Sequence, residues 1–227
     1  MTINFVKIRV PLKGLSEETT IDFASDLHLR IEENLEEFME VAQQFRSGNL
    51  LLAGDYSENH PLIEKMVSSL GTLDTNVIAI FGNNDRIYKA AFFMESKKYD
   101  NIAFYQDEIL DLNGINLLCA HDRQEGQWLV RSLPETPLII LAHSPDMLLQ
   151  LPESVPFTFL AGHVHGGQFR IPQWPWWWTH TEIGRAHADG YSKRGENDIF
   201  VGRDIGYSLM NLRNVPKEVY EITFCPA

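Results

Sequence analysis

Short apolar runs that stop at potential metal ligands constrain the fold of this chain more than any other feature. Four such runs cover residues 21–25, 49–54, 77–82 and 138–142. The residues that follow them are Asp26 and His28, then Asp55, then Asn83, Asn84 and Asp85, and finally His143. Runs rich in Ile, Val and Leu are typical of strands buried on both faces, and residues just past the carboxyl ends of such strands share one edge of a sheet. With the segment Gly162-His163-Val164-His165-Gly166-Gly167, the sequence predicts a polynuclear metal site at that edge.

The bulk composition favours one domain with a substantial core. The 227 residues are 44% hydrophobic and contain no Pro/Gly/Ser-rich linker, so we expect a single domain over residues 1–227. The formal net charge of -12 opposes binding to double-stranded nucleic acid, because that affinity comes from clustered Lys and Arg. Only Cys119 and Cys225 are present, which favours a reducing compartment. With no signal-peptide pattern and no run of about 18 apolar residues, a cytoplasmic protein is expected.

The remaining periodicity predicts an α/β chain. Apolar residues recur at helical spacing over residues 32–46 and again over residues 62–70, where Pro61 and Gly71 mark the two ends. Further strands are predicted at residues 102–105, 109–112, 115–120, 198–202 and 218–224. Asn113-Gly114 marks a tight hairpin turn between two of them, so the middle of the chain is expected to be more antiparallel.

The mixture of Asp, Asn and His in the predicted site selects a class of metal ion. Such a set suits borderline cations such as Mn, Fe or Zn, whereas oxygen ligands alone favour Mg or Ca. Two ions about 3.5–4 Å apart clamp the attacking and leaving oxygens of a phosphoryl transfer and lower the pKa of a bound water. We therefore expect two divalent ions and a carboxylate that bridges them.

The ligand motifs together resemble the calcineurin-like metallophosphoesterase superfamily across nearly the whole chain. The motifs are Asp26-Leu27-His28, Gly54-Asp55, Gly82-Asn83-Asn84-Asp85, His143 and Gly162-His163-Val164-His165. The resemblance implies a four-layer α/β/β/α sandwich of two mixed sheets. It also implies two ligand sets that share Asp55. One set is Asp26, His28, Asp55 and His165, and the other is Asp55, Asn83, His143 and His163.

Two longer segments, residues 162–172 and 203–208, resemble a bacterial branch of phosphodiesterases that includes UDP-diacylglucosamine hydrolases. Members of that branch commonly carry an amino-terminal membrane segment, which this sequence lacks. Asp122 matches an acidic position of the branch. It is a candidate to bind substrate or to support a metal ligand, and a hydrogen-bonded loop residue is an equal alternative. Gln168, Arg170 and Arg185 are candidates to grip a phosphate or diphosphate, with surface salt bridges as the alternative for each arginine.

Asn84 departs from the family pattern, whose Gly-Asn-His-Asp motif appears here as Gly82-Asn83-Asn84-Asp85. The resemblance assigns the histidine to proton donation to the leaving oxygen, and an amide donates a hydrogen bond but delivers no proton near neutral pH. Asn84 therefore predicts slow cleavage of esters with poor leaving groups and favours phosphodiesters or pyrophosphates. Two alternatives stay open. Asn84 shapes the loop only, or the protein is a metal-binding scaffold with weak or no catalysis.

A tryptophan cluster is the last unusual feature. Its members are Trp174, Trp176, Trp177 and Trp178. So much aromatic area is costly to leave in water, so a covering surface is expected. The alternatives are the domain's own edge or a partner subunit, and an acyl-chain groove or a peripheral membrane contact. The combined prediction is a binuclear phosphohydrolase that acts on a phosphodiester or pyrophosphate of a small-molecule or lipid-linked nucleotide.

Overall fold

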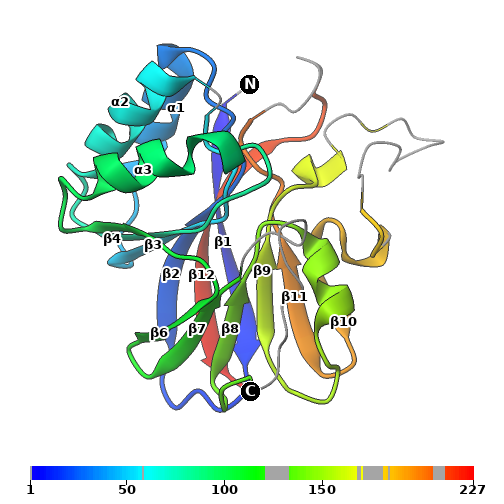
Figure 1. Cartoon of the computed structure of the whole chain (residues 1–227). Helices are drawn as coiled ribbons and strands as arrows, with labels where there is room; N and C mark the ends of the chain where they lie inside the picture. The colour runs from blue at the N-terminus through cyan, green and yellow to red at the C-terminus, as the bar shows by residue number, and fades with distance from the viewer. Residues whose placement is uncertain are drawn as a thin grey trace.

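Two six-stranded sheets pack face to face in the computed structural model (Figure 1). The structure describes residues 2–57, 59–120, 133–167, 170, 181–183, 185–206 and 213–227. The first sheet has the order β1-β12-β2-β3-β4-β5, and the second has the order β10-β11-β9-β8-β7-β6. Both sheets contain parallel and antiparallel pairs. The predicted α/β fold with two mixed sheets is therefore confirmed.

The first sheet carries the α-helices. Its strands are β1 (Ile3–Leu12), β2 (Thr19–Ala24), β3 (Asn49–Leu52), β4 (Asn76–Ala79), β5 (Ile102–Phe104) and β12 (Lys217–Pro226). The helices are α1 (Glu32–Ala42), α2 (His60–Leu70) and α3 (Lys89–Ser96), preceded by the 3-10 turn η1 (Arg86–Tyr88). Strands β2 to β5 run parallel, so each helix serves as a crossover between neighbouring strands.

The second sheet combines a parallel centre with antiparallel edges. Its strands are β6 (Glu108–Leu112), β7 (Ile115–Cys119), β8 (Leu138–Leu141), β9 (Thr158–Ala161), β10 (Gly190–Arg194) and β11 (Asn197–Val201). The 3-10 segments described beside them are η3 (Pro145–Gln150), η4 (His165–Gly167) and η5 (Arg185–His187). The predicted Asn113-Gly114 turn joins β6 to β7 with positive φ at both residues, 55° and 83°.

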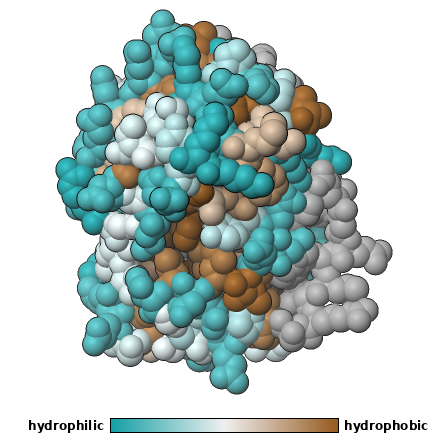
Figure 2. Space-filling view, turned by 60° about the vertical axis from the view of Figure 1, so that its left-hand side comes forward, coloured by the Kyte–Doolittle hydropathy of each residue, from teal (hydrophilic) through white to brown (hydrophobic). Residues whose placement is uncertain are grey.

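Alternation along the central strands explains why they appear in the sequence as continuous apolar runs. Leu50 and Leu52 of β3 pack against the helices, whereas Leu51 between them packs against the second sheet. In β8, Ile139 faces the first sheet while Ile140 faces a separate core that includes residues of η3. Both faces are thus buried, as parallel strands require. On the face shown in Figure 2, hydrophilic residues surround smaller apolar areas.

One predicted helix ends earlier in the structure, and two strands and one helix were not predicted, namely β1, β10 and α3. Helix α1 ends at Ala42 instead of continuing to residue 46, because the following residues form turns. The Arg46 guanidinium stabilises these turns by donating to the carbonyls of Gln43 and Phe45 at 2.6 and 2.7 Å. Among the strands that the structure describes, β1 pairs only with β12 at the sheet edge, and its apolar residues alternate with exposed ones instead of forming a run. Within the described residues, no helix is both long and apolar enough to cross a membrane.

Candidate metal centre

The predicted ligands lie in five loops that follow β2, β3, β4, β8 and β9. The first three strands belong to one sheet and the last two to the other. The expectation that all ligands share one edge of a single sheet is therefore wrong. Because the two sheets are stacked with these loops at the same end, ligands from both sheets meet between them (Figure 1).

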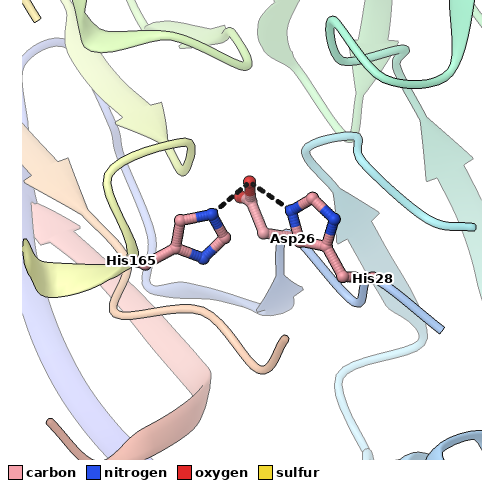
Figure 3. Close-up of side chains that lie close together, drawn as sticks. All are labelled: Asp26, His28 and His165. Atoms are coloured by element: carbon pink, nitrogen blue, oxygen red, sulfur yellow. Dashed lines mark ion pairs between the residues drawn. The ribbon is translucent and has the colours of Figure 1, made fainter. Parts of the chain in front are cut away.

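The first ligand cluster consists of Asp26, His28 and His165, all buried (Figure 3). Asp26 Oδ1 lies 3.8 Å from His28 Nε2 and 3.8 Å from His165 Nε2. These separations are too long for hydrogen bonds. Within the described part of the chain, Asp26 Oδ1 and His28 Nε2 have no hydrogen-bond partner at all. A cation with ligand distances of about 2.0–2.2 Å fits between such atoms and would satisfy them.

The second ligand cluster consists of Asp55, His143 and His163, with Asn83 beside it. His143 Nδ1 donates to the Ala53 carbonyl oxygen at 2.7 Å, so Nε2 is the nitrogen that carries the lone pair when the imidazole is neutral. That nitrogen lies 3.0 Å from Asn83 Oδ1, 3.1 Å from His163 Nδ1 and 3.4 Å from Asp55 Oδ2. Several electron-pair donors thus converge on one point, and the set fits a borderline divalent ion.

Asp55 faces both clusters. Its Oδ2 lies 3.6 Å from His28 Nε2 of the first cluster and 3.4 Å from His143 Nε2 of the second. Burial alone would raise the pKa of Asp55, but the imidazoles of His143 and His28 hold it well below its usual range. An ionised carboxylate at this place has the position expected of a bridging ligand.

The histidines respond to the same burial in different ways. Burial lowers the pKa of His165 to about 3, so its imidazole is neutral, which is the form that binds metal ions. Burial also acts to lower the pKa of His143, but the carboxylates of Asp55 and Asp26 raise it well above its ordinary value. Metal binding to this cluster would therefore displace a proton.

Left-handed backbone conformations aim these side chains at one another. Asp26, His28, Asp55, His163 and His165 have φ values of 51°, 41°, 56°, 73° and 51°. Such conformations cost about 1–2 kcal/mol per non-glycine residue and cluster at functional sites. Backbone bonds between loops hold them, including His28 N to Asp55 O at 3.0 Å.

Two glycines let the loops approach closely enough for the ligands to converge. A Cβ atom at Gly82 would collide with the Asp55 carboxylate, and one at Gly162 would collide with the Asp26 carboxylate. The glycines at these strand ends are therefore needed for close approach, whatever the function of the site.

Asn84 contacts the carboxylate between the clusters. Its backbone N–H donates to Asp55 Oδ1 at 2.9 Å, and its side-chain amide donates to Asp55 Oδ2 at 2.6 Å. The amide therefore orients Asp55, which goes beyond shaping its own loop. That Asn84 acts in catalysis stays a prediction.

Asp85 supports the site, although the sequence analysis assigned it no role. Its buried carboxylate accepts the backbone N–H groups of Asp55, Tyr56 and Gly82 at 2.7, 2.9 and 2.9 Å. Burial, and then the charge of Asp55, raise the pKa of Asp85 to about 7. The available sequence signal was its place in the Gly82–Asp85 motif.

Asp204 is the second supporting residue without a predicted role. Its buried carboxylate accepts the Ser25 hydroxyl and the His165 backbone N–H, the latter at 2.8 Å. Burial and the nearby Asp26 carboxylate raise the pKa of Asp204 well above its ordinary value. In the sequence, residues 203–208 resemble the bacterial phosphodiesterase branch, but that resemblance assigned no contact to Asp204.

The candidate substrate contacts are placed only in part. Arg170 forms an ion pair with Asp189, and its Nε donates to the Gly166 carbonyl at 2.7 Å, next to His165. A substrate contact by Arg170 stays a prediction. The remaining candidates lie outside the described residues, with only the backbone of Arg185 described. They are Asp122, Gln168, the Arg185 side chain, Trp174, Trp176, Trp177 and Trp178.

Comparison with known proteins identifies a family model and several relatives. Residues 19–182 match the model for calcineurin-like phosphoesterases. The chain is 25% identical over 187 residues to the uncharacterized metallophosphoesterase YkuE of Bacillus subtilis, covering 75% of this chain and 63% of that protein. It is 30% identical over 178 residues to the phosphodiesterase YaeI of Escherichia coli, covering 72% of this chain and 65% of that protein.

A second Bacillus subtilis relative is matched over more of its length. The uncharacterized metallophosphoesterase YkoQ is 22% identical over 210 residues, covering 83% of this chain and 77% of that protein. The chain thus spans less than two thirds of YkuE and YaeI but more of YkoQ.

Proposed function

Because the chain belongs to the calcineurin-like phosphoesterase family, we propose that it is a binuclear metal-dependent phosphohydrolase that prefers phosphodiesters to phosphomonoesters. One observation carries this proposal. Two clusters of potential ligands, Asp26/His28/His165 and Asp55/His143/His163, lie on either side of the Asp55 carboxylate.

The contacts of each residue indicate its role in the proposed reaction. When bound, two divalent ions would supply positive charge at the phosphoryl group and lower the pKa of a water molecule for attack. Asp55 would hold both ions, and Asn84 would orient Asp55 through the 2.6 Å hydrogen bond from its side-chain amide. Since an amide delivers no proton, the site suits leaving groups that depart as stable anions.

The substrate we propose is a phosphodiester or pyrophosphate in a small-molecule or lipid-linked nucleotide. The name of YaeI, a phosphodiesterase, supports the diester preference. The net charge of -12 supports exclusion of double-stranded nucleic acid. We propose Mn, Fe or Zn as the ions, since each cluster combines imidazoles with a carboxylate. A cytoplasmic location, with peripheral membrane or subunit contact through the tryptophan cluster, belongs to the same proposal.

The test compares hydrolysis of bis-p-nitrophenyl phosphate and p-nitrophenyl phosphate by metal-depleted protein reloaded with Mn, Zn, Fe or Mg. We expect metal-dependent cleavage with a higher kcat/KM for the diester. Asp55→Asn should abolish turnover, whereas Asp74→Asn makes the same chemical change on the exposed surface and should not. Activity that survives in Asp55→Asn, or that does not depend on metal, contradicts the assignment.

The second candidate is a metal-binding scaffold, favoured by Asn84 at the position of the family's catalytic histidine. The same hydrolysis assay distinguishes this scaffold from a phosphodiesterase. Protein that contains two ions per chain and cleaves neither ester would be a binding module, and the diesterase proposal would be wrong.

A further inference from the structure

The Asp204 carboxylate lies where three loops of the candidate metal centre meet. One oxygen accepts the hydroxyl of Ser25, the residue before Asp26, and the other accepts the backbone N–H of His165 at 2.8 Å. Asp204 itself follows β11, so it links loops from the two sheets. The side chain is fully buried, and it faces the first ligand cluster through His165.

The ring of His165 points its two nitrogens at two different carboxylates. Nε2 faces Asp26 Oδ1 inside the ligand cluster at 3.8 Å. Nδ1 faces Asp204 Oδ2 at 3.6 Å and has no hydrogen-bond partner among the described residues. If Nε2 provides the lone pair to an ion, Nδ1 carries the hydrogen and faces Asp204 Oδ2, which at 3.6 Å lies just beyond hydrogen-bonding distance, so metal binding must shorten this separation to complete the bond. A metal-binding imidazole usually donates its second N–H to a carboxylate or a carbonyl in this way.

The backbone at Asp204 indicates that this carboxylate is held in place against a conformational preference. Its φ is 64°, a region that glycine adopts without strain and other residues adopt only when surrounding contacts enforce it. Two such contacts hold its carbonyl oxygen, which accepts from Arg213 at 3.1 Å and from the Glu218 backbone N–H at 3.2 Å.

The two clusters orient their histidines with different groups. In the second cluster, His143 Nδ1 donates to the neutral carbonyl oxygen of Ala53. In the first cluster, the group opposite His165 Nδ1 is the carboxylate of Asp204. Loss of Asp204 should therefore affect one site and leave the other intact.

We propose that Asp204 is a positioning residue that holds His165 in the orientation and tautomer needed to bind the ion of the Asp26/His28/His165 cluster. This inference rests on the proposed binuclear site but does not depend on which ester the protein cleaves. Asp204 acts through His165 and is not expected to contact the substrate.

Two variants separate the contribution of the Asp204 carboxylate from that of the backbone conformation at this position. Asp204→Gly removes the side chain and suits the φ of 64°, so the loop should keep its course. Asp204→Asn keeps an oxygen for the His165 N–H and tolerates left-handed backbone, but carries no charge. Asp198→Asn is the matched control, because Asp198 is a buried carboxylate of β11, the strand that precedes Asp204, and its partners Tyr191 and Lys193 lie outside the ligand clusters.

The measurement is Mn²⁺ binding to metal-depleted full-length protein by titration calorimetry, with bound Mn counted by elemental analysis. We expect wild type and Asp198→Asn to bind two ions per chain. Asp204→Gly should weaken one of the two sites by about 10–100-fold and leave the other unchanged, and Asp204→Asn should have a smaller effect in the same direction.

Single-site backgrounds identify which site is weakened. In His163→Ala, which retains the first cluster, Asp204→Gly should lower the remaining affinity by the same factor. In His28→Ala, which retains the second cluster, Asp204→Gly should change nothing. Thermal melting without metal shows whether each variant is folded.

Several results would overturn the proposal. Unchanged binding in Asp204→Gly, or equal weakening in both single-site backgrounds, would leave Asp204 with a general structural role. Wild-type protein that binds two ions yet cleaves no ester would refute the proposed function. The Asp204 proposal would still be tested in that case, because its test measures Mn²⁺ binding and not hydrolysis. Wild-type protein that binds no Mn²⁺ would refute both.

Discussion

Removal of the Asp85 carboxylate should destabilise the fold and the candidate metal centre together. The carboxylate is fully buried and accepts three backbone N–H groups, those of Asp55, Tyr56 and Gly82. Asp85→Ala leaves all three donors without a partner. At about 1–3 kcal/mol for each buried polar group left unsatisfied, the free energy of unfolding should fall by at least about 3 kcal/mol.

Asp85→Asn should lower the free energy of unfolding by less, and the hydrogen-bond geometry shows by how much. Oδ2 accepts two of the three bonds and Oδ1 accepts one. An amide oxygen at the place of Oδ2 keeps two bonds, and its NH₂ group then faces the Tyr56 N–H, so the expected loss is about 1–3 kcal/mol.

The assay is thermal unfolding followed by circular dichroism at pH 8, above the pKa of about 7 that burial gives Asp85, so that the wild-type carboxylate is ionised. For a chain of this length 1 kcal/mol corresponds to about 2–4 °C, so Asp85→Ala should melt at least about 6 °C below wild type. Asp100→Ala, an exposed Asp→Ala change, is the matched control. If Asp85→Ala melts within 2 °C (roughly 1 kcal/mol) of that control, the N–H contacts contribute little and the reasoning is wrong.

Three further predictions use other parts of the molecule. Asn84→His should raise turnover most on esters with poor leaving groups, because an imidazole delivers a proton that an amide does not; an unchanged ratio of rates between good and poor leaving groups would leave Asn84 as a residue that only orients Asp55. Chelation of metal should lower the melting temperature, and added Mn²⁺ should restore about 2.7 kcal/mol at 100 times its Kd; a melting temperature independent of Mn²⁺ would argue against binding to the folded state. Burial raises the pKa of Cys119 to about 12, so iodoacetamide at pH 8.5 should label Cys225 and spare Cys119 until the protein unfolds, whereas equal labelling rates in the native protein would contradict the buried position of β7.

The central strands and the ligand residues were predictable because their signals are local. A strand buried on both faces must be apolar at every position, so β3 and β8 appear in the sequence as runs with clear ends. The ligands follow those ends directly. The prediction was less good where the signal is weaker, as at the sheet edge, where β1 alternates between buried and exposed residues.

By itself, the sequence determined the strand runs, the residues at their ends and therefore the type of chemistry available to them. Only the tertiary structure decided which sheet each strand joins and which distant residues complete the site. Ser25 and Asp204 lie 179 positions apart, and His143 and Ala53 lie 90 apart, yet both pairs are joined by hydrogen bonds. The physical reason is that periodicity records whether a side chain is buried, whereas the partner that satisfies a buried polar atom is set by how the two sheets stack.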